Sequence, residues 1–253
     1  MKKQKHQLII AGLLIFFLAL CPENSLAAKK KSSKGKSRHK SSSHVSRHVS
    51  QPSKKVDKSP VSQLLKKIEN RYDSVSFSAD FFQESPLPEI QVTETAQGKA
   101  YFKKTGKFRW EYEKPEVLHY ISNGVTLWIH SPSDNNVWTG KSKEFFGKGS
   151  GANVLTDVKQ IRNQFVVSIA ESSDENTTRL KLVPKNKTMG FTDIFLTVDN
   201  GTYDILKIVS FNMNGEETRI EFKNLEFKPF SDDVMFNFKI PAKANVIPLE
   251  QKM

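Results

Sequence analysis

Residues 98–130 have the sequence GKAYFKKTGKFRWEYEKPEVLHYISNGVTLWIH, which predicts consecutive short strands joined by sharp turns. The alternation is clearest at its centre, where Phe108, Trp110 and Tyr112 are separated by charged residues. Successive side chains of a strand point to opposite faces, so one face of this strand is aromatic and the other is suited to water. The question is whether the aromatic face packs on a closed core or on a bound molecule.

Turns on both sides of this strand indicate hairpins. Thr105-Gly106 precedes it, and Asn123-Gly124 lies between two later apolar runs, which is a strong hairpin signal. We expect about nine to eleven antiparallel strands in all, more than a flat sheet accommodates without curling. The further strand-like segments are 76–83, 95–104, 137–139, 180–183, 191–198, 205–213, 218–227 and 236–240.

Two stripes of apolar residues predict amphipathic helices. Ser59 and Pro60 are a suitable N-cap and first residue for one helix. Its apolar stripe is Val61, Leu64, Leu65, Ile68 and Tyr72, and a second stripe consists of Val154, Leu155, Val158, Ile161 and Phe165. The predicted fold is therefore mainly β, with a strongly curved antiparallel sheet that forms an incomplete barrel and amphipathic helices that cover its concave face.

The net charge of +12 is concentrated near the N-terminus. Residues 29–60 contain eleven Lys or Arg and one Asp, whereas residues 61–253 contain 25 basic and 25 acidic residues. This distribution argues against a nucleic-acid-binding domain. We expect residues 28–59, rich in Lys, Ser and His, to be a disordered linker, either a plain tether or a segment that contacts anionic lipid or cell wall.

Residues 1–27 are typical of a secretory signal peptide, with Lys2, Lys3 and Lys5 before the apolar run Leu8–Leu20. We place cleavage after Ala27, which leaves residues 60–253 as one exported domain without cysteine. Cys21 offers an alternative, because a cysteine after an apolar run can be acylated. Leu20 stands where that processing prefers a small residue.

Catalytic and metal-binding patterns are not found in the sequence. The histidines after residue 60 are His119 and His130, which fall on different predicted strands without an accompanying nucleophile or acid. Glu111 and Glu113 share the polar side of the central strand, where a solvated face explains them. We therefore expect no enzymatic activity, no metal and no cofactor.

Aromatic and apolar residues are the positive signal. They fall on single strand faces, as a closed core or a ligand cavity would both require, and the pattern does not separate these two. The candidate lining residues are Phe77, Phe81, Phe108, Trp110, Tyr112, Leu127, Phe236 and Phe238, and the candidate lid residues are Leu64, Leu65, Ile68, Val154, Leu155 and Val158.

Several motifs resemble the periplasmic outer-membrane lipoprotein carrier family of the LolA type. FSADFFQ at 77–83 is similar to its F-x-A-x-F-x-Q strand, GKAYFKK followed by GKFRWEY resembles its central block, and SNGVTLW at 122–128 resembles its S-D-G-x-x-L-W turn. FNFKIP at 236–241 resembles its closing motif. Lys104-Thr105 stands where the family has Arg-Pro, and Ala244 where it usually has glycine.

The resemblance implies a monomeric carrier that shelters the acyl chains of lipoproteins in an apolar cavity. It also implies an inner-membrane ABC transporter that releases this cargo and an outer-membrane acceptor that receives it. Lys104 would take the place of the family arginine that holds the lid shut, although an ammonium lacks the planar fork of a guanidinium.

Three alternatives remain open at this stage. The first is a receptor of the same fold that is anchored in the outer membrane through a lipidated Cys21. The second is a carrier of the same fold for another lipid. The third is a cell-wall-binding protein that acts through residues 29–60.

Overall fold

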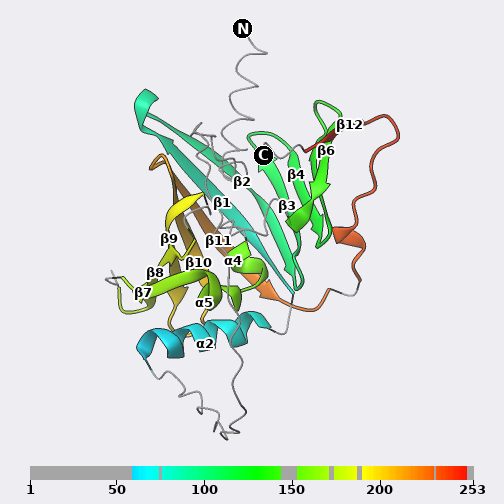
Figure 1. The fold of residues 1–253 in the computed structure, drawn as a ribbon. Coiled ribbons are helices and arrows are strands. Elements are labelled where there is room, and N and C mark those ends of the chain that lie inside the picture. The colour runs from blue at the N-terminus through cyan, green and yellow to red at the C-terminus, as the bar shows by residue number, and fades with distance from the viewer. Residues whose placement is uncertain are drawn as a thin grey trace, which may run out of the picture.

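The computed structural model describes residues 59–73, 76–143, 153–170, 174–186, 190–230 and 232–249. Its strands form one twelve-stranded sheet with the order β12-β6-β5-β4-β3-β2-β1-β11-β10-β9-β8-β7 (Figure 1). The predicted signal peptide, Cys21 and residues 28–58 of the predicted linker lie outside the described residues.

The strands have the following bounds: β1 Phe77–Leu87, β2 Val92–Lys103, β3 Lys107–Lys114, β4 Leu118–Asn123, β5 Thr126–Ser131, β6 Asn136–Lys141, β7 Phe165–Ile169, β8 Thr177–Pro184, β9 Phe191–Asp199, β10 Ile205–Asn212, β11 Glu217–Phe227 and β12 Asn245–Pro248. The helices are α2 Pro60–Asp73, α4 Asn153–Thr156, α5 Gln160–Gln164 and the 3-10 turns η1 Pro88–Ile90 and η3 Val234–Phe236.

The sheet is antiparallel except at one edge, where β12 runs parallel to β6. It is curved and does not close, since β7 and β12 form its two edges and do not pair with each other. The mainly β, incompletely closed fold is thus confirmed. The sequence predicted nine to eleven strands and missed both edge strands, β7 and β12, which are only five and four residues long.

One face of the sheet carries the core. In β3 the buried residues alternate strictly with partly buried ones, as the sequence predicted. Helix α2 packs on this same core through Leu65, Ile68 and Tyr72, which are at most 7% exposed. We call this face of the sheet the inner face and the opposite one the outer face.

The second predicted helix, residues 154–165, is wrong as a continuous helix. The chain forms the short helices α4 and α5, separated by a turn, and Phe165 already has extended backbone and begins β7. All five stripe residues are nevertheless buried. The periodicity identified the buried side of the segment, whereas pairing of Phe165–Ile169 with β8 ends the helix.

The predicted strand 236–240 is also wrong. Val234–Phe236 forms the 3-10 turn η3, and the chain then runs without ladder pairing until Asn245 begins β12. Another difference concerns β1, which continues through Pro86 to Leu87 where the sequence indicated an end. Proline is tolerated where one side of a strand has no partner, and β11 pairs with β1 only as far as Glu84.

Within the described ranges, no helix has the length and apolar character needed to cross a membrane.

Candidate functional site

The inner face is centred on aromatic rings from three adjacent strands. Trp110 and Tyr112 of β3 are 2% and 0% exposed. Phe81 of β1 packs edge-on against both, with ring centroids 4.8 and 4.9 Å away, and Phe102 of β2 lies 5.5 Å from Trp110. Gly98 of β2 makes this close strand packing possible, because a Cβ there would lie 1.8 Å from the carbonyl oxygen of Glu111.

Hydrogen bonds of Gln83 pair polar atoms beside these rings: its Nε2 donates to Oγ of Ser85 at 3.3 Å, and its Oε1 accepts from Tyr112. The Tyr112 hydroxyl donates to Oε1 of Gln83 at 2.9 Å, and Gln83 is 3% exposed. Burial holds the pKa of Tyr112 well above its usual value, so the phenol is neutral. The inner face around Trp110 and Tyr112 is therefore uncharged, which suits hydrocarbon better than a polar ligand.

Other predicted lining residues belong to the same core but differ in position. Phe77 lies at the end near α2, where it stacks on Phe102 at 4.7 Å and meets Tyr72 at 5.1 Å. Phe108 and Leu127 are 2% and 1% exposed and join the same cluster. The structure thus brings together six predicted residues on one face, namely Phe77, Phe81, Phe108, Trp110, Tyr112 and Leu127.

Phe236 and Phe238 correct the prediction, because they lie against the outer face. The ring of Phe238 contacts His130 and Trp128 of β5, at 5.0 and 6.4 Å. Leu127 and Ile129, which alternate with these residues along β5, point into the core. Phe236 is fully buried, and its ring centroid lies 5.9 Å from that of Phe230. It does not belong to the cluster of buried residues on the inner face, which we call the inner cluster.

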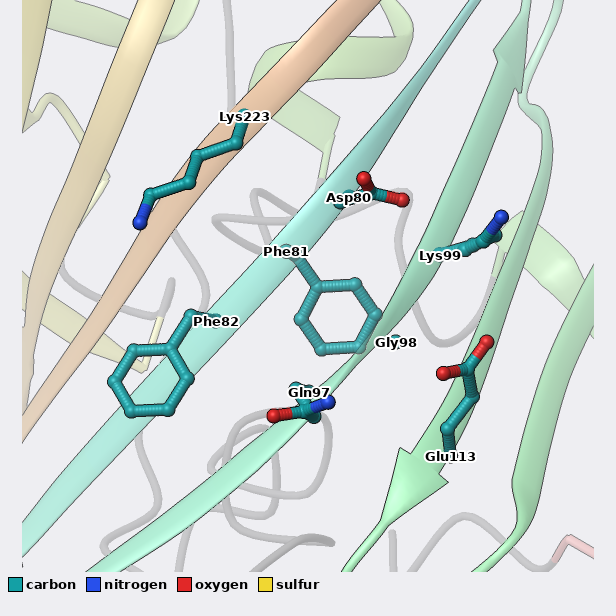
Figure 2. Close-up of a pocket in the computed structure, with 8 residues that line it drawn as sticks. All are labelled: Asp80, Phe81, Phe82, Gln97, Gly98, Lys99, Glu113 and Lys223. Atoms are coloured by element: carbon teal, nitrogen blue, oxygen red, sulfur yellow. The ribbon is translucent and has the colours of Figure 1, made fainter.

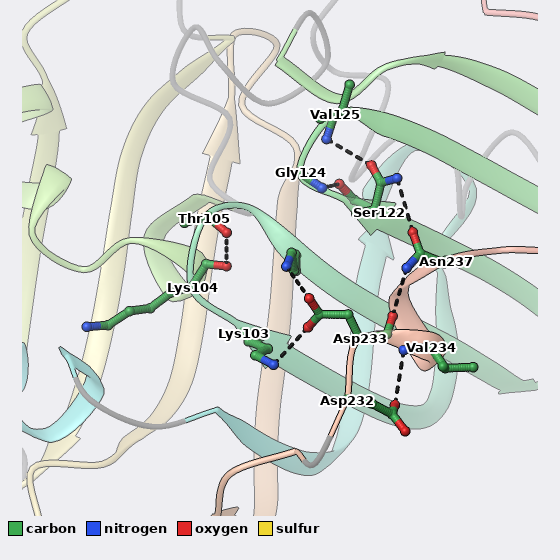
Figure 3. A network of polar contacts seen from close by, with 12 residues as sticks. Lys103, Lys104, Thr105, Ser122, Gly124, Val125, Asp232, Asp233, Val234 and Asn237 are labelled. Carbon is green, nitrogen blue, oxygen red and sulfur yellow. Dashed lines mark hydrogen bonds and ion pairs between the residues drawn. The ribbon is translucent and has the colours of Figure 1, made fainter.

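Polar contacts hold this C-terminal segment on the outer face (Figure 3). Asp233 accepts hydrogen bonds from Lys103 at 2.7 Å and Lys107 at 2.6 Å, and Arg109 donates to the carbonyl oxygen of Met235 at 3.1 Å. The segment therefore crosses the outer side of β2 and β3. The sequence pattern missed this because two phenylalanines with one residue between them are also typical of a strand face.

The predicted lid residues pack on the inner cluster. Leu65, Ile68, Val154, Leu155 and Val158 are at most 5% exposed, and Leu64 is partly buried against them. The two parts of the lid are joined by Arg162 of α5, which pairs with Glu69 and donates to the carbonyl oxygen of Ser62 at 2.7 Å, both on α2.

Helix α2 is also attached to the turn between β9 and β10. Arg71 pairs with Asp204 at 2.7 Å, and the Tyr72 hydroxyl accepts a hydrogen bond from the backbone N–H of Ile205 at 2.8 Å. Lys67 donates to the Tyr203 hydroxyl at 2.8 Å. These contacts fix the helix on the β9–β10 side of the sheet.

On the β2–β3 side, the lid is held through Asp73, the last residue of α2. Its Oδ1 lies 3.0 Å from Nζ of Lys104 and 2.6 Å from Nζ of Lys159. Hydrogen bonds from Lys159 and Lys104 lower the pKa of Asp73 to about 2. Lys104 thus contacts Asp73 of α2, a carboxylate that it shares with Lys159.

The turn that carries Lys104 is closely packed. Thr105 and Gly106 both have positive φ, at 69° and 76°. Ser122 donates to the carbonyl oxygen of Gly106 at 2.9 Å. Gly124, with φ of 89°, lies so close that a Cβ there would come within 2.4 Å of the carbonyl oxygen of Thr105.

A separate, open cavity of about 430 Å³ with a mixed polar and apolar lining lies over β1, β2, β3 and β11 (Figure 2). Charged groups of both signs surround it, so it does not resemble a site for acyl chains. Its lining residues are Asp80, Phe81, Phe82, Gln97, Gly98, Lys99, Glu113 and Lys223.

The two histidines are cross-strand neighbours on β4 and β5, with ring centroids 5.7 Å apart. Burial lowers the pKa of both His119 and His130, which favours neutral imidazoles. Among the residues that the structure describes, no three His, Cys, Asp or Glu side chains are placed to hold a metal ion.

The family model and the curated relatives agree on one family. The family model described as "Outer membrane lipoprotein carrier protein LolA" matches residues 73–239. An outer-membrane lipoprotein carrier protein of Methylobacillus flagellatus is 26% identical over 60% of this chain and 72% of its own length. The protein of that name from Methylococcus capsulatus is 27% identical over 68% and 80%.

The matches among solved structures are more distant in sequence. An uncharacterised conserved protein from Thermus thermophilus has a TM-score of 0.49 at 14% identity and covers 74% of this chain and 97% of its own. A LolA superfamily protein from Nitrosomonas europaea has a TM-score of 0.42 at 11% identity, with coverage of 70% and 97%.

Proposed function

Because the chain belongs to the LolA family of outer membrane lipoprotein carrier proteins, we propose that it binds the acyl chains of lipoproteins against its inner face and carries them from the inner to the outer membrane. The cargo would come from an inner-membrane ABC transporter and pass to an outer-membrane acceptor. The carrier would act in the periplasm as a monomer and without covalent chemistry.

The observation that carries this proposal is the uncharged aromatic face under a two-part helical lid. Burial of acyl methylenes on such a face is favourable by about 0.8 kcal/mol each. Trp110 and Tyr112 are almost fully buried in the structure. An acyl chain that reaches them therefore requires the lid to move, and its apolar lid residues would then line the bound chain.

The lid contacts suggest how this movement occurs. Helix α2 is attached to the β9–β10 turn by Arg71 and Tyr72, and to α5 by Arg162. On the opposite side it is held by Lys104, whose side chain is 53% exposed. An exposed ion pair is weak and easily exchanged for water, so we infer that the lid opens on the side of Lys104.

Native mass spectrometry of the full chain, purified from the periplasm of its own cells, tests the proposal. We expect a one-to-one complex with an acylated protein, and the same complex after the empty carrier is incubated with a triacylated lipoprotein in detergent micelles. A deacylated form of that lipoprotein is the control and should not bind. Equal binding of both forms, or a different co-purifying lipid, would contradict the lipoprotein-carrier function.

A further inference from the structure

Beyond the body of the sheet, β1 and β2 continue as a two-stranded arm, residues 85–95, that is closed by η1. β11 pairs with β1 only as far as Glu84, and β3 pairs with β2 only from Gln97 onwards. Among the described strands, none pairs with the arm on either side, and the arm projects past its neighbours (Figure 1). Isolated two-stranded ribbons are only marginally stable in water.

The tip of the arm exposes apolar side chains. Ile90 is 65% exposed and Val92 is 48% exposed. The backbone between them is well defined: Gln91 has a φ of 52°, and its N–H donates to the carbonyl oxygen of Pro88 at 3.3 Å. Scattered exposed apolar residues are common, but two neighbours at the end of a projecting hairpin form a surface suited to insertion into a partner.

The charge around this tip is acidic. Residues 85–95 contain Glu89 and Glu94 and no lysine or arginine. Glu84, just before the arm, lies opposite Arg219 in the ladder, whereas Glu89 and Glu94 lie on the arm itself. An anionic membrane surface would repel these carboxylates, whereas a basic protein surface would attract them.

We propose that the arm is a docking element for a second protein, which receives Ile90 and Val92 in an apolar pocket rimmed by lysine or arginine. The apolar residues supply the buried contact, and Glu89 and Glu94 select a basic rim over an acidic one. The arm lies beyond the aromatic centre of the inner face and can dock without displacing a bound acyl chain. This inference goes beyond the carrier function and does not depend on which lipid is carried.

Site-specific photo-cross-linking of the full chain in its own cells tests this proposal. The photoreactive residue p-benzoylphenylalanine replaces Ile90, and Met213, which is 62% exposed on the β10–β11 turn, is the control position. We expect a dominant protein adduct from position 90 that is at least tenfold stronger than from position 213. Peptide mapping should place its contact next to apolar residues flanked by lysine or arginine.

Charge reversal provides the second part of the experiment. Glu89→Lys should weaken the adduct at least fivefold, whereas Glu175→Lys, at an exposed position before β8, should leave it unchanged. Both variants should retain lipoprotein capture, which separates failure of the docking proposal from failure of the carrier function. A lipid adduct, an adduct with a second copy of the chain, an adduct insensitive to Glu89→Lys or no adduct above the control would each overturn the proposal.

Discussion

The ammonium of Lys104, at the β2–β3 turn, lies 3.0 Å from the carboxylate of Asp73, the last residue of α2. A carboxylate is unfavourable at the C-terminal end of a helix, where the helix dipole is negative. Lys104 and Lys159 offset this charge together. The contact joins the lid to the sheet on the side opposite the Arg71–Asp204 pair.

Lys104→Leu should slow cargo release more than it alters cargo uptake. In the proposed mechanism, the Lys104–Asp73 pair stabilises the closed, empty carrier. Without this pair, the empty state is less favourable relative to the loaded state. Because exposed ion pairs are weak, we expect transfer to an acceptor to slow by about two- to fivefold. Lys66→Leu, on α2, is the control. An unchanged transfer rate would show that Lys104 has no role in opening or closing the lid.

The carboxylate of Asp73 should titrate with a pKa of about 2, below its ordinary value of 3.8. Because the folded-state pKa is depressed, the contribution of Asp73 to lid closure is complete above pH 4 and is lost as the pH falls from about 4 to 2. Carbon NMR of the carboxyl group measures this directly. The Lys104→Leu/Lys159→Leu variant should titrate near 3.8, and an ordinary wild-type midpoint would show that the three side chains do not meet in solution.

Gly124→Ala should destabilise the protein by about 2–4 kcal/mol, because a methyl group would collide with the carbonyl oxygen of Thr105 and the residue would have an unfavourable φ. Gly215→Ala is a matched control. It has a similar φ of 82°, but its added Cβ meets nothing within 4 Å, so about 1 kcal/mol is expected. Urea unfolding compares the two. Equal losses of stability would mean that the β4–β5 turn, which carries Gly124, does not contact the β2–β3 turn, which carries Thr105.

Trp110 on the inner face and Trp128 on the outer face can be substituted as a matched pair. Trp110→Ser removes a ring from the inner cluster, whereas Trp128→Ser removes one that packs on Phe238. Truncation of a buried tryptophan costs about 3–5 kcal/mol of stability, so capture is measured at a temperature where both variants remain folded. We expect at least a tenfold loss of lipoprotein capture for Trp110→Ser only. Equal lipoprotein capture by the two variants would show that Trp110 only packs in the protein core and does not contact the acyl chain.

Period-two alternation predicted the centre of the fold accurately. Phe108, Trp110 and Tyr112 are buried on one face of β3 because each contacts neighbours on adjacent strands, and the hairpin turns follow from glycines with positive φ. Helical periodicity was less informative at Val154–Phe165. It identified the buried residues, but an apolar stripe does not show where the chain leaves the helix to pair with a neighbouring strand.

The C-terminal residues were mispredicted for a related reason. Phe236 and Phe238 are apolar enough for either face of the sheet, and their place is set by contacts with distant residues: Asp233 with Lys103 and Lys107, and Phe238 with Trp128. The Lys104–Asp73 contact is equally non-local. The family resemblance pointed to Lys104, whereas its partner Asp73 could be identified only from the structure.

Photo-cross-linking from a bound lipid can show whether acyl chains bind against the inner face. The probe is a triacylated lipopeptide with a diazirine on one acyl chain, bound to the full-length carrier and mapped by mass spectrometry. We predict adducts on inner-face residues, with Phe81, Trp110 and Tyr112 foremost, and their loss when unlabelled lipopeptide competes. Adducts concentrated on the outer face, at Trp128 or Phe238, would show that the inner face does not hold the acyl chains.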